Sequence, residues 1–211
     1  MLEQDAYEQI KKRILLGKYP MGAVLSEVAI ADELEMSRTP VRSALNRLYC
    51  EGFINQKKGH FSTVRTVTPK DIHNFFQFSY IIQEYALRKI YEQPDAFDVS
   101  VLEQAVDQQE KALVEGDVLS YFGNQHTYHM ALIGFLGNEE ISRTLENMWE
   151  KIMMLSYPHS LANKNYWDKE KTIAKYRDIC RALREREPLE TVIDKMNQID
   201  EDARNRLLFL S

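Results

Sequence analysis

Apolar residues recur at helical spacing in the first part of the chain. The first helix is expected over residues 6–16, because one stripe of this segment is apolar: Tyr7, Ile10 and Ile14. A second helix is expected to begin after Ser26 and a third, over residues 38–51, after Ser37. A serine hydroxyl in these positions can accept a hydrogen bond from the free N–H groups at the start of a helix.

Two short runs of strand-forming residues follow the third helix. They occupy residues 53–56 and 62–67, and the Lys-Lys-Gly-His turn between them is typical of a hairpin. Two helices separated by a tight turn, with a hairpin behind them, are the parts of a winged helix-turn-helix. We therefore expect residues 1–68 to form such a domain, with three helices and a β-hairpin wing.

The rest of the chain has helical periodicity and no strand pattern. After a boundary at Thr68-Pro69, helices are expected near residues 70–92, 100–115, 118–136, 139–156, 167–186 and 189–209. Ser100 with Glu103 has the spacing of a capping box, and Pro188 marks a break. Residues 69–211 are therefore expected to form an all-α bundle of six helices, which makes the whole chain mainly α.

Charge distribution changes the picture of the first domain. The chain of 211 residues has a formal net charge of −5, which by itself argues against a nucleic-acid partner. Residues 36–65, however, contain six basic residues and one acidic residue, whereas residues 69–211 contain 17 basic and 24 acidic residues. A solvated charged face would also explain the basic cluster. Its overlap with the third helix and the hairpin favours contact with DNA phosphates.

Composition excludes several other classes of protein. The chain has no run of about 18 apolar residues and its N-terminus is polar, so neither a transmembrane helix nor a secretory signal is expected. Cys50 and Cys180 lie far apart without CxxC spacing, which argues against a disulfide framework and a zinc knuckle. We therefore expect a cytoplasmic protein without a membrane partner.

The third predicted helix carries the residue types that DNA recognition requires. A recognition helix places its N-terminal residues at base edges in the major groove. Arg38 can form a bidentate contact with guanine, and Arg42 lies one turn later on the same face, where it suits a phosphate or a second base. The basic wing turn suits the adjacent minor groove. The predicted contacts with double-stranded operator DNA are Ser37, Arg38, Thr39, Arg42, Arg47, Lys57, Lys58, Gly59 and His60.

At these residues the sequence resembles the GntR family of bacterial regulators, through LSEVAIADELEMSRTPVRSALNRLYCEGFI followed by KKGHFSTV. The six-helix part resembles the FCD effector domain of the FadR subfamily more loosely, through YHMALIGFLGNEEI. The resemblance implies a homodimer that binds a short palindromic operator, with the second domain holding both the dimer and a small-molecule effector. The family usually has glycine where this chain has Glu35, a position expected to be left-handed.

The resemblance also bears on metal binding. Family members that bind a metal in the second domain use an aspartate and a histidine four residues apart, with two further histidines from the last two helices. These positions fall at Gln125, His129, Tyr176 and Ile199. One imidazole, an amide, a phenol and an aliphatic chain do not make a transition-metal site. We expect no metal and no cofactor there, with His126 as the candidate for a relocated ligand.

Two interpretations of this second site stay open. In the first, an uncharged, partly apolar pocket for an unknown small-molecule effector is lined by Tyr80, Gln83, Gln125, His129 and Tyr176. In the second, the pocket has collapsed into packing and His129 is a hydrogen-bonded core residue. The usual inward arginine of the family falls at Ser79, which removes an obvious partner for a carboxylate. The effector-pocket candidates are Ser79, Gln83, Gln125, His129, Tyr176 and Ile199.

Three functional hypotheses follow from these residues. The leading one is a sequence-specific regulator, a repressor that a ligand releases from DNA. The second is a constitutive DNA-binding dimer without an effector. The third is an enzyme in the helical domain, against which stand the lack of a nucleophile–base spacing, of a glycine-rich phosphate loop and of a carboxylate–histidine cluster. The sequence therefore predicts a regulator and no enzyme.

Overall fold

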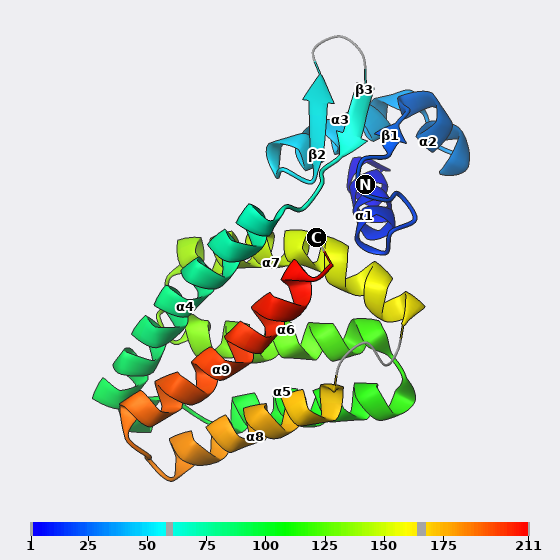
Figure 1. Ribbon diagram of the computed structural model, residues 1–211. Coiled ribbons are helices and arrows are strands. Elements are labelled where there is room, and N and C mark those ends of the chain that lie inside the picture. The colour runs from blue at the N-terminus through cyan, green and yellow to red at the C-terminus, as the bar shows by residue number, and fades with distance from the viewer. Residues whose placement is uncertain (1, 58–60, 164–167, 211) are drawn as a thin grey trace. The chain divides into compact units, whose positions relative to one another are not determined.

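The computed structural model describes residues 2–57, 61–163 and 168–210 (Figure 1). The chain divides into two compact units. The first comprises Met1–Thr68 with Trp149–Pro158, and the second comprises Pro69–Met148 with His159–Ser211. Within the described residues, no helix combines the length and the apolarity that crossing a membrane requires.

The first unit contains a winged helix-turn-helix. Its helices are α1 (Leu2–Leu15), α2 (Glu27–Glu33) and α3 (Arg38–Cys50). Its strands, β1 (Val24–Leu25), β2 (Ile54–Lys57) and β3 (Phe61–Val64), form an antiparallel sheet in the order β1-β3-β2. The three helices and the hairpin wing confirm the prediction. Strand β1 was not predicted, because two residues are too few to show an alternation of apolar and polar positions.

The apolar stripes of α1 and α3 hold this domain together. Helix α1 packs against α3. Burial of each large aliphatic side chain in this contact stabilises the folded state by on the order of 1.5–3 kcal/mol. The opposite face of α3 is left exposed to solvent. The side chains buried along the two helices are Ala6, Ile10, Ile14, Val41, Ala44, Leu45 and Leu48.

The turn between α2 and α3 contains Glu35 in the left-handed conformation, with a φ of 55°. This confirms the conformation expected from the sequence, at a cost of about 1 kcal/mol relative to glycine. The N–H of Met36 donates to the carbonyl of Ala31 at 2.9 Å, and the neighbouring Leu34 is buried. These two interactions hold the turn that separates the two helices.

The second unit is helical. Helix α4 packs against α6 and α9, and α5 packs against α6 and α8. Figure 1 shows α4 and α9 side by side along their length. The six predicted helices are confirmed: they are α4 (Pro69–Glu92), α5 (Ser100–Glu115), α6 (Val118–Gly134), α7 (Glu139–Ala162), α8 (Lys169–Arg184) and α9 (Leu189–Leu208), with a short 3₁₀ helix, η1 (Pro94–Ala96), after α4.

Two local predictions in this part of the chain are wrong. Helix α7 does not end near residue 156 but continues through Pro158 to Ala162. Burial of Tyr157 and Ser160 on either side of the proline favours the continued helix over a break. Ser100 does not cap α5; it is the first helical residue, and its N–H donates to Oδ1 of Asp98 at 2.9 Å. A carboxylate is a stronger acceptor than a hydroxyl, which explains the shifted start.

Candidate DNA-binding surface and polar centre

Arg38 and Arg42 lie one turn apart on the exposed face of α3. Their side chains are 60% and 59% exposed. Both guanidinium groups approach the same atom, Oε2 of Glu27 in the first turn of α2, at 3.7 Å and 3.4 Å respectively. An exposed ion pair of this kind contributes at most about 1 kcal/mol, so both arginines can exchange it for another anion. The two predicted contacts therefore share one accessible surface.

The start of α3 is open to solvent. Ser37 occupies the N-cap position in extended conformation, but its side chain does not form the expected capping hydrogen bond. By contrast, Ser26 caps α2 as predicted, since its hydroxyl accepts from the N–H of Ala29. Ser37 and Thr39 are both exposed. The free N–H groups of a helix start attract anions, which makes this end of α3 suitable for a phosphate.

Arg47 differs from the other two arginines of α3. Its guanidinium carbon lies 3.7 Å from the centre of the Tyr7 ring, and it donates to Oε1 of Gln4 at 2.8 Å and to Oε1 of Glu51 at 2.9 Å. The hydroxyl of Tyr7 donates to Oε2 of Glu51 at 2.6 Å, which closes the cluster. These contacts tie α1 to α3, a role that the sequence pattern did not suggest. A DNA contact by Arg47 stays a prediction.

The wing pairs Lys57 with Phe61 at the tip of the described hairpin. Lys58, Gly59 and His60 lie outside the described residues. Contact of these three residues and of Lys57 with DNA stays a prediction.

A chain of hydrogen-bonded polar side chains lies in the interior of the second unit. Gln83 of α4 is at its middle. Its Oε1 lies 2.8 Å from Nδ1 of His129 on α6. Its Nε2 donates to the hydroxyl of Ser79 at 2.6 Å and to Oδ2 of Asp200 on α9 at 3.0 Å. Gln83 therefore joins three helices through its two polar atoms.

Tyr176 of α8 continues this chain. Its hydroxyl lies 2.9 Å from Nε2 of His129 and accepts a hydrogen bond from Nε2 of Gln125 at 2.9 Å. Because the side-chain oxygen of Gln83 can only accept, the proton of His129 is on Nδ1 and its Nε2 accepts from the Tyr176 hydroxyl. The polar centre, as we call Ser79, Gln83, Gln125, His129, Tyr176 and Asp200, thus links α4, α6, α8 and α9.

Burial keeps the polar centre close to neutral. It lowers the pKa of His129 to about 3, with the charge of His126 as a smaller cause, so the imidazole is uncharged at neutral pH. Burial raises the pKa of Asp200 to about 7, against the opposing effect of the hydrogen bond from Gln83. Burial also raises the pKa of Tyr176 well above its ordinary value. A neutral imidazole with both nitrogens bonded favours the interpretation of His129 as a core residue.

The structure brings together five of the predicted pocket residues and separates others. Ile199 is buried but has no polar group to add to the centre. Tyr80 is 38% exposed and is not among the side chains that form the polar centre. Asp200 was not predicted. It lies four residues after the buried Met196, so a carboxylate on an apolar helical stripe was the signal in the sequence.

The polar centre does not fit a transition metal, so we expect no stoichiometric metal there. In the part of the chain that the structure describes, no three His, Cys, Asp or Glu side chains are grouped to hold an ion. Elemental analysis of the full-length protein should find zinc, nickel and manganese far below stoichiometry, and a chelator should leave the unfolding transition unchanged. A stoichiometric metal that is lost in His129→Ala would contradict this expectation.

Comparison with known proteins extends over both parts of the chain. The family model described as "Bacterial regulatory proteins, gntR family" matches residues 2–64, and the FCD domain model matches residues 74–192. The chain is 28% identical over 135 residues to the Nta operon transcriptional regulator of Aminobacter aminovorans, with 62% of each chain covered. It is 23% identical over 143 residues to the uncharacterized HTH-type transcriptional regulator YdhC of Bacillus subtilis, with 67% of this chain and 64% of that protein covered. The chain therefore spans less than two thirds of the length of these relatives.

Solved structures show the same fold. A GntR protein from Rhodococcus sp. RHA1 has a TM-score of 0.82 at 19% identity, covering 99% of this chain and 98% of that one. Escherichia coli McbR/YncC has a TM-score of 0.76 at 18% identity, covering 98% and 97%. The fold and the matched models define a winged helix-turn-helix protein with a helical FCD domain. The chain belongs to the GntR family of bacterial regulatory proteins, with a FadR-like arrangement of domains.

Proposed function

We propose that this protein is a sequence-specific, DNA-binding transcriptional regulator. The observation that carries the proposal is the exposed start of α3, where Arg38 and Arg42 stand on a helix whose other face is anchored in the domain core. A helix held in this way can enter the major groove as a rigid body. The two curated relatives are named as transcriptional regulators, which supports the same function. We propose that the protein has no enzymatic activity. We also propose that it is located in the cytoplasm, because it can reach the bacterial chromosome there.

The proposed assembly is a homodimer on a palindromic operator. One recognition helix with two exposed arginines gives a small interface, and a single module rarely reaches operator-level affinity. Two-fold symmetry presents two such helices to two half-sites. The proposed domains are residues 1–68 and residues 69–211. We propose that the second, helical domain holds the dimer, because it is the larger of the two.

The proposed regulation is release of a repressor from DNA by a small molecule that binds the helical domain. The match to the FCD domain and the buried carboxyl group of Asp200, whose pKa is raised by burial, support a ligand response. A constitutive DNA-binding dimer is the alternative. Operator affinity measured with and without candidate ligands separates the two.

Arg38 is expected to read a base pair and Arg42 to anchor the backbone of DNA. On an operator selected from random DNA, Arg38→Ala should weaken binding by about 1–3 kcal/mol and relax the preference at one base pair. Arg42→Ala should weaken binding to all sequences and lower the slope of log K against log salt by about 1. Fluorescence anisotropy at several salt concentrations measures both.

The matched control is Arg143→Ala, which removes an exposed arginine from α7. It should leave operator affinity unchanged. An equal loss on operator and random DNA in Arg38→Ala would show that Arg38 contacts phosphate alone.

A further inference from the structure

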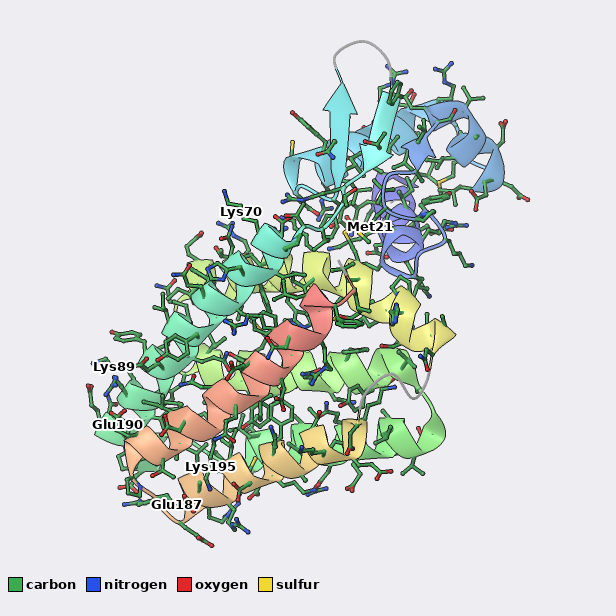
Figure 2. All side chains as sticks on the ribbon, in the orientation of Figure 1. Met21, Lys70, Lys89, Glu187, Glu190 and Lys195 are labelled. Atoms are coloured by element: carbon green, nitrogen blue, oxygen red, sulfur yellow. The ribbon has the colours of Figure 1, made fainter. Side chains whose placement is uncertain are left out.

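A groove with a volume of about 380 Å³ runs between α4 and α9. Figure 2 shows Lys70 in the first turn of α4 and Glu190 in the first turn of α9 at opposite ends of this helix pair, so the two helices are antiparallel. The groove lies between the first half of α4 and the last half of α9, and its volume is within the range of small-molecule sites. Its lining includes His73, Phe76 and Tyr80 on α4 and Asp200, Glu201 and Arg204 on α9.

Asp200 connects this groove to the polar centre. Its side chain lines the groove, although the residue is only 9% exposed. Oδ2 accepts the hydrogen bond from Gln83 at 3.0 Å, and none of the described residues donates to Oδ1. Each carboxyl oxygen can accept two hydrogen bonds, so Oδ1 keeps its full accepting capacity on the groove side. Asp200 therefore offers its second oxygen to a donor that enters the groove.

Arg204 lies one turn after Asp200 on the same helix and lines the same groove. Its Nε is buried and has no hydrogen-bond partner among the described residues. The terminal nitrogen Nη2 lies 3.6 Å from Oε1 of Glu201, whose side chain is 64% exposed. This is a loose, solvent-exposed pair that another carboxylate can replace at little cost. Arg204 therefore has a weakly held charge at Nη2, which the carboxylate of a ligand can take over.

The groove therefore presents the carboxyl group of Asp200 and the guanidinium of Arg204 about 5–6 Å apart at their Cβ atoms, beside aromatic surface. We propose that the groove binds a small zwitterion of the amino-acid class, with its ammonium group on Asp200 and its carboxylate on Arg204. The ammonium gives Oδ1 the donor that it lacks, and the ligand carboxylate accepts from the guanidinium of Arg204. Phe76 and Tyr80 contact the rest of the ligand.

The position of Asp200 also connects such a ligand, through a chain of hydrogen bonds, to residues in the interior of the helical domain. Asp200 is bonded to Gln83, and Gln83 accepts from His129, which is bonded to Tyr176 of α8. An ammonium group bound to Asp200 stabilises the charged form of the carboxylate. The charged carboxylate accepts a stronger hydrogen bond from the Gln83 amide than the protonated form does. This step rests on the proposed ligand response for its effect on DNA, whereas the binding itself does not.

The test is a thermal-unfolding screen of the full-length protein, without DNA, against each common L-amino acid at about 10 mM. At least one should raise the melting temperature by a few degrees. Calorimetry should then find one ligand per chain. Asp200→Asn and Arg204→Gln should each weaken binding by at least about ten-fold, and the amine or the carboxylic acid that keeps only one charged end should bind more weakly by a similar factor.

The matched controls are Asp194→Asn, an exposed acid on α9 outside the groove, and Arg143→Gln on α7. Both should bind the ligand like the unaltered chain. The proposal is overturned if no amino acid raises the melting temperature, or if a bound amino acid is indifferent to both groove substitutions. Sedimentation of the groove variants gives a further check, because dissociation of a dimer without any amino-acid binding would make the groove a subunit interface. None of these outcomes would contradict the proposed function as a DNA-binding regulator, because that function is tested by operator binding in the absence of ligand.

Discussion

The full-length protein should bind a palindromic DNA with two half-sites about 10²–10⁴-fold more tightly than DNA that carries one half-site. The reason is effective concentration: once one recognition helix is bound, the proposed dimer would hold the second close to its own half-site. The exposed start of one α3 helix offers only a small interface to DNA. We therefore expect the linkage of two such helices in one dimer to supply much of the operator affinity. Fluorescence anisotropy with the selected operator and a copy scrambled in one half-site measures the ratio.

Two further measurements make this prediction specific. Sedimentation should show two chains on each operator, and a spacer that moves one half-site by half a helical turn should abolish the gain. Random DNA of the same length provides the baseline. Equal affinities for the full palindrome and the single half-site would rule out the proposed assembly.

Substitution of Asp200 should make folding stability less dependent on pH, with an effect of up to about 4 kcal/mol. The carboxyl has a pKa of about 7 in the folded protein and 3.8 as its ordinary value, because burial opposes its charge. Between these values the folded state holds a proton that the unfolded state releases. Stability linked to Asp200 is therefore greatest below pH 4 and is lost as the pH rises through 7. Asp200→Asn should match the unaltered chain near pH 4 and exceed its stability near pH 8.

The comparison between variants isolates Asp200 from its neighbours. His129 acts in the opposite direction, since its lowered pKa makes stability fall as the pH drops from 6.5 towards 3, but it is present in both proteins. Asp200 is hydrogen-bonded to Gln83 of α4 and shares its groove with His73 of α4 and with Glu201 and Arg204 of its own helix, and Tyr176 of α8 also interacts with its charge. Urea unfolding at pH 4 to 8 gives the free-energy difference, with Asp194→Asn as the exposed control. A stability difference that does not change with pH would show that folding does not raise the pKa of Asp200.

Much of the fold could be predicted because both domains consist of amphipathic helices. The stripe of Ile10 and Ile14 and the capping serine at Ser26 mark α1 and α2 by local rules that the structure obeys. What the sequence did not show depends on packing between distant residues. Helix α7 passes through Pro158, and β1 exists through its pairing with β3, which no local pattern records.

The polar centre shows the same limit at the level of single residues. The resemblance to the family assigned Gln125, His129 and Tyr176 to one site, and the structure joins them by hydrogen bonds. The inward turn of Asp200 was missed, because an acid is assumed to face solvent unless a partner is known. Gln83, its partner, lies 117 residues away in the chain, beyond the reach of any periodicity.

Glu27 has a consequence for how such a protein finds its site. Its carboxylate already gives Arg38 and Arg42 a partner inside the protein, so the proposed contact of these arginines with DNA requires that the pairing be broken. An operator compensates for the loss with base contacts, whereas a random stretch offers phosphates alone. Random stretches make up nearly the whole chromosome. We therefore expect the Glu27 carboxylate to shorten the residence time of the protein on random DNA and to raise the fraction of protein that is not bound there.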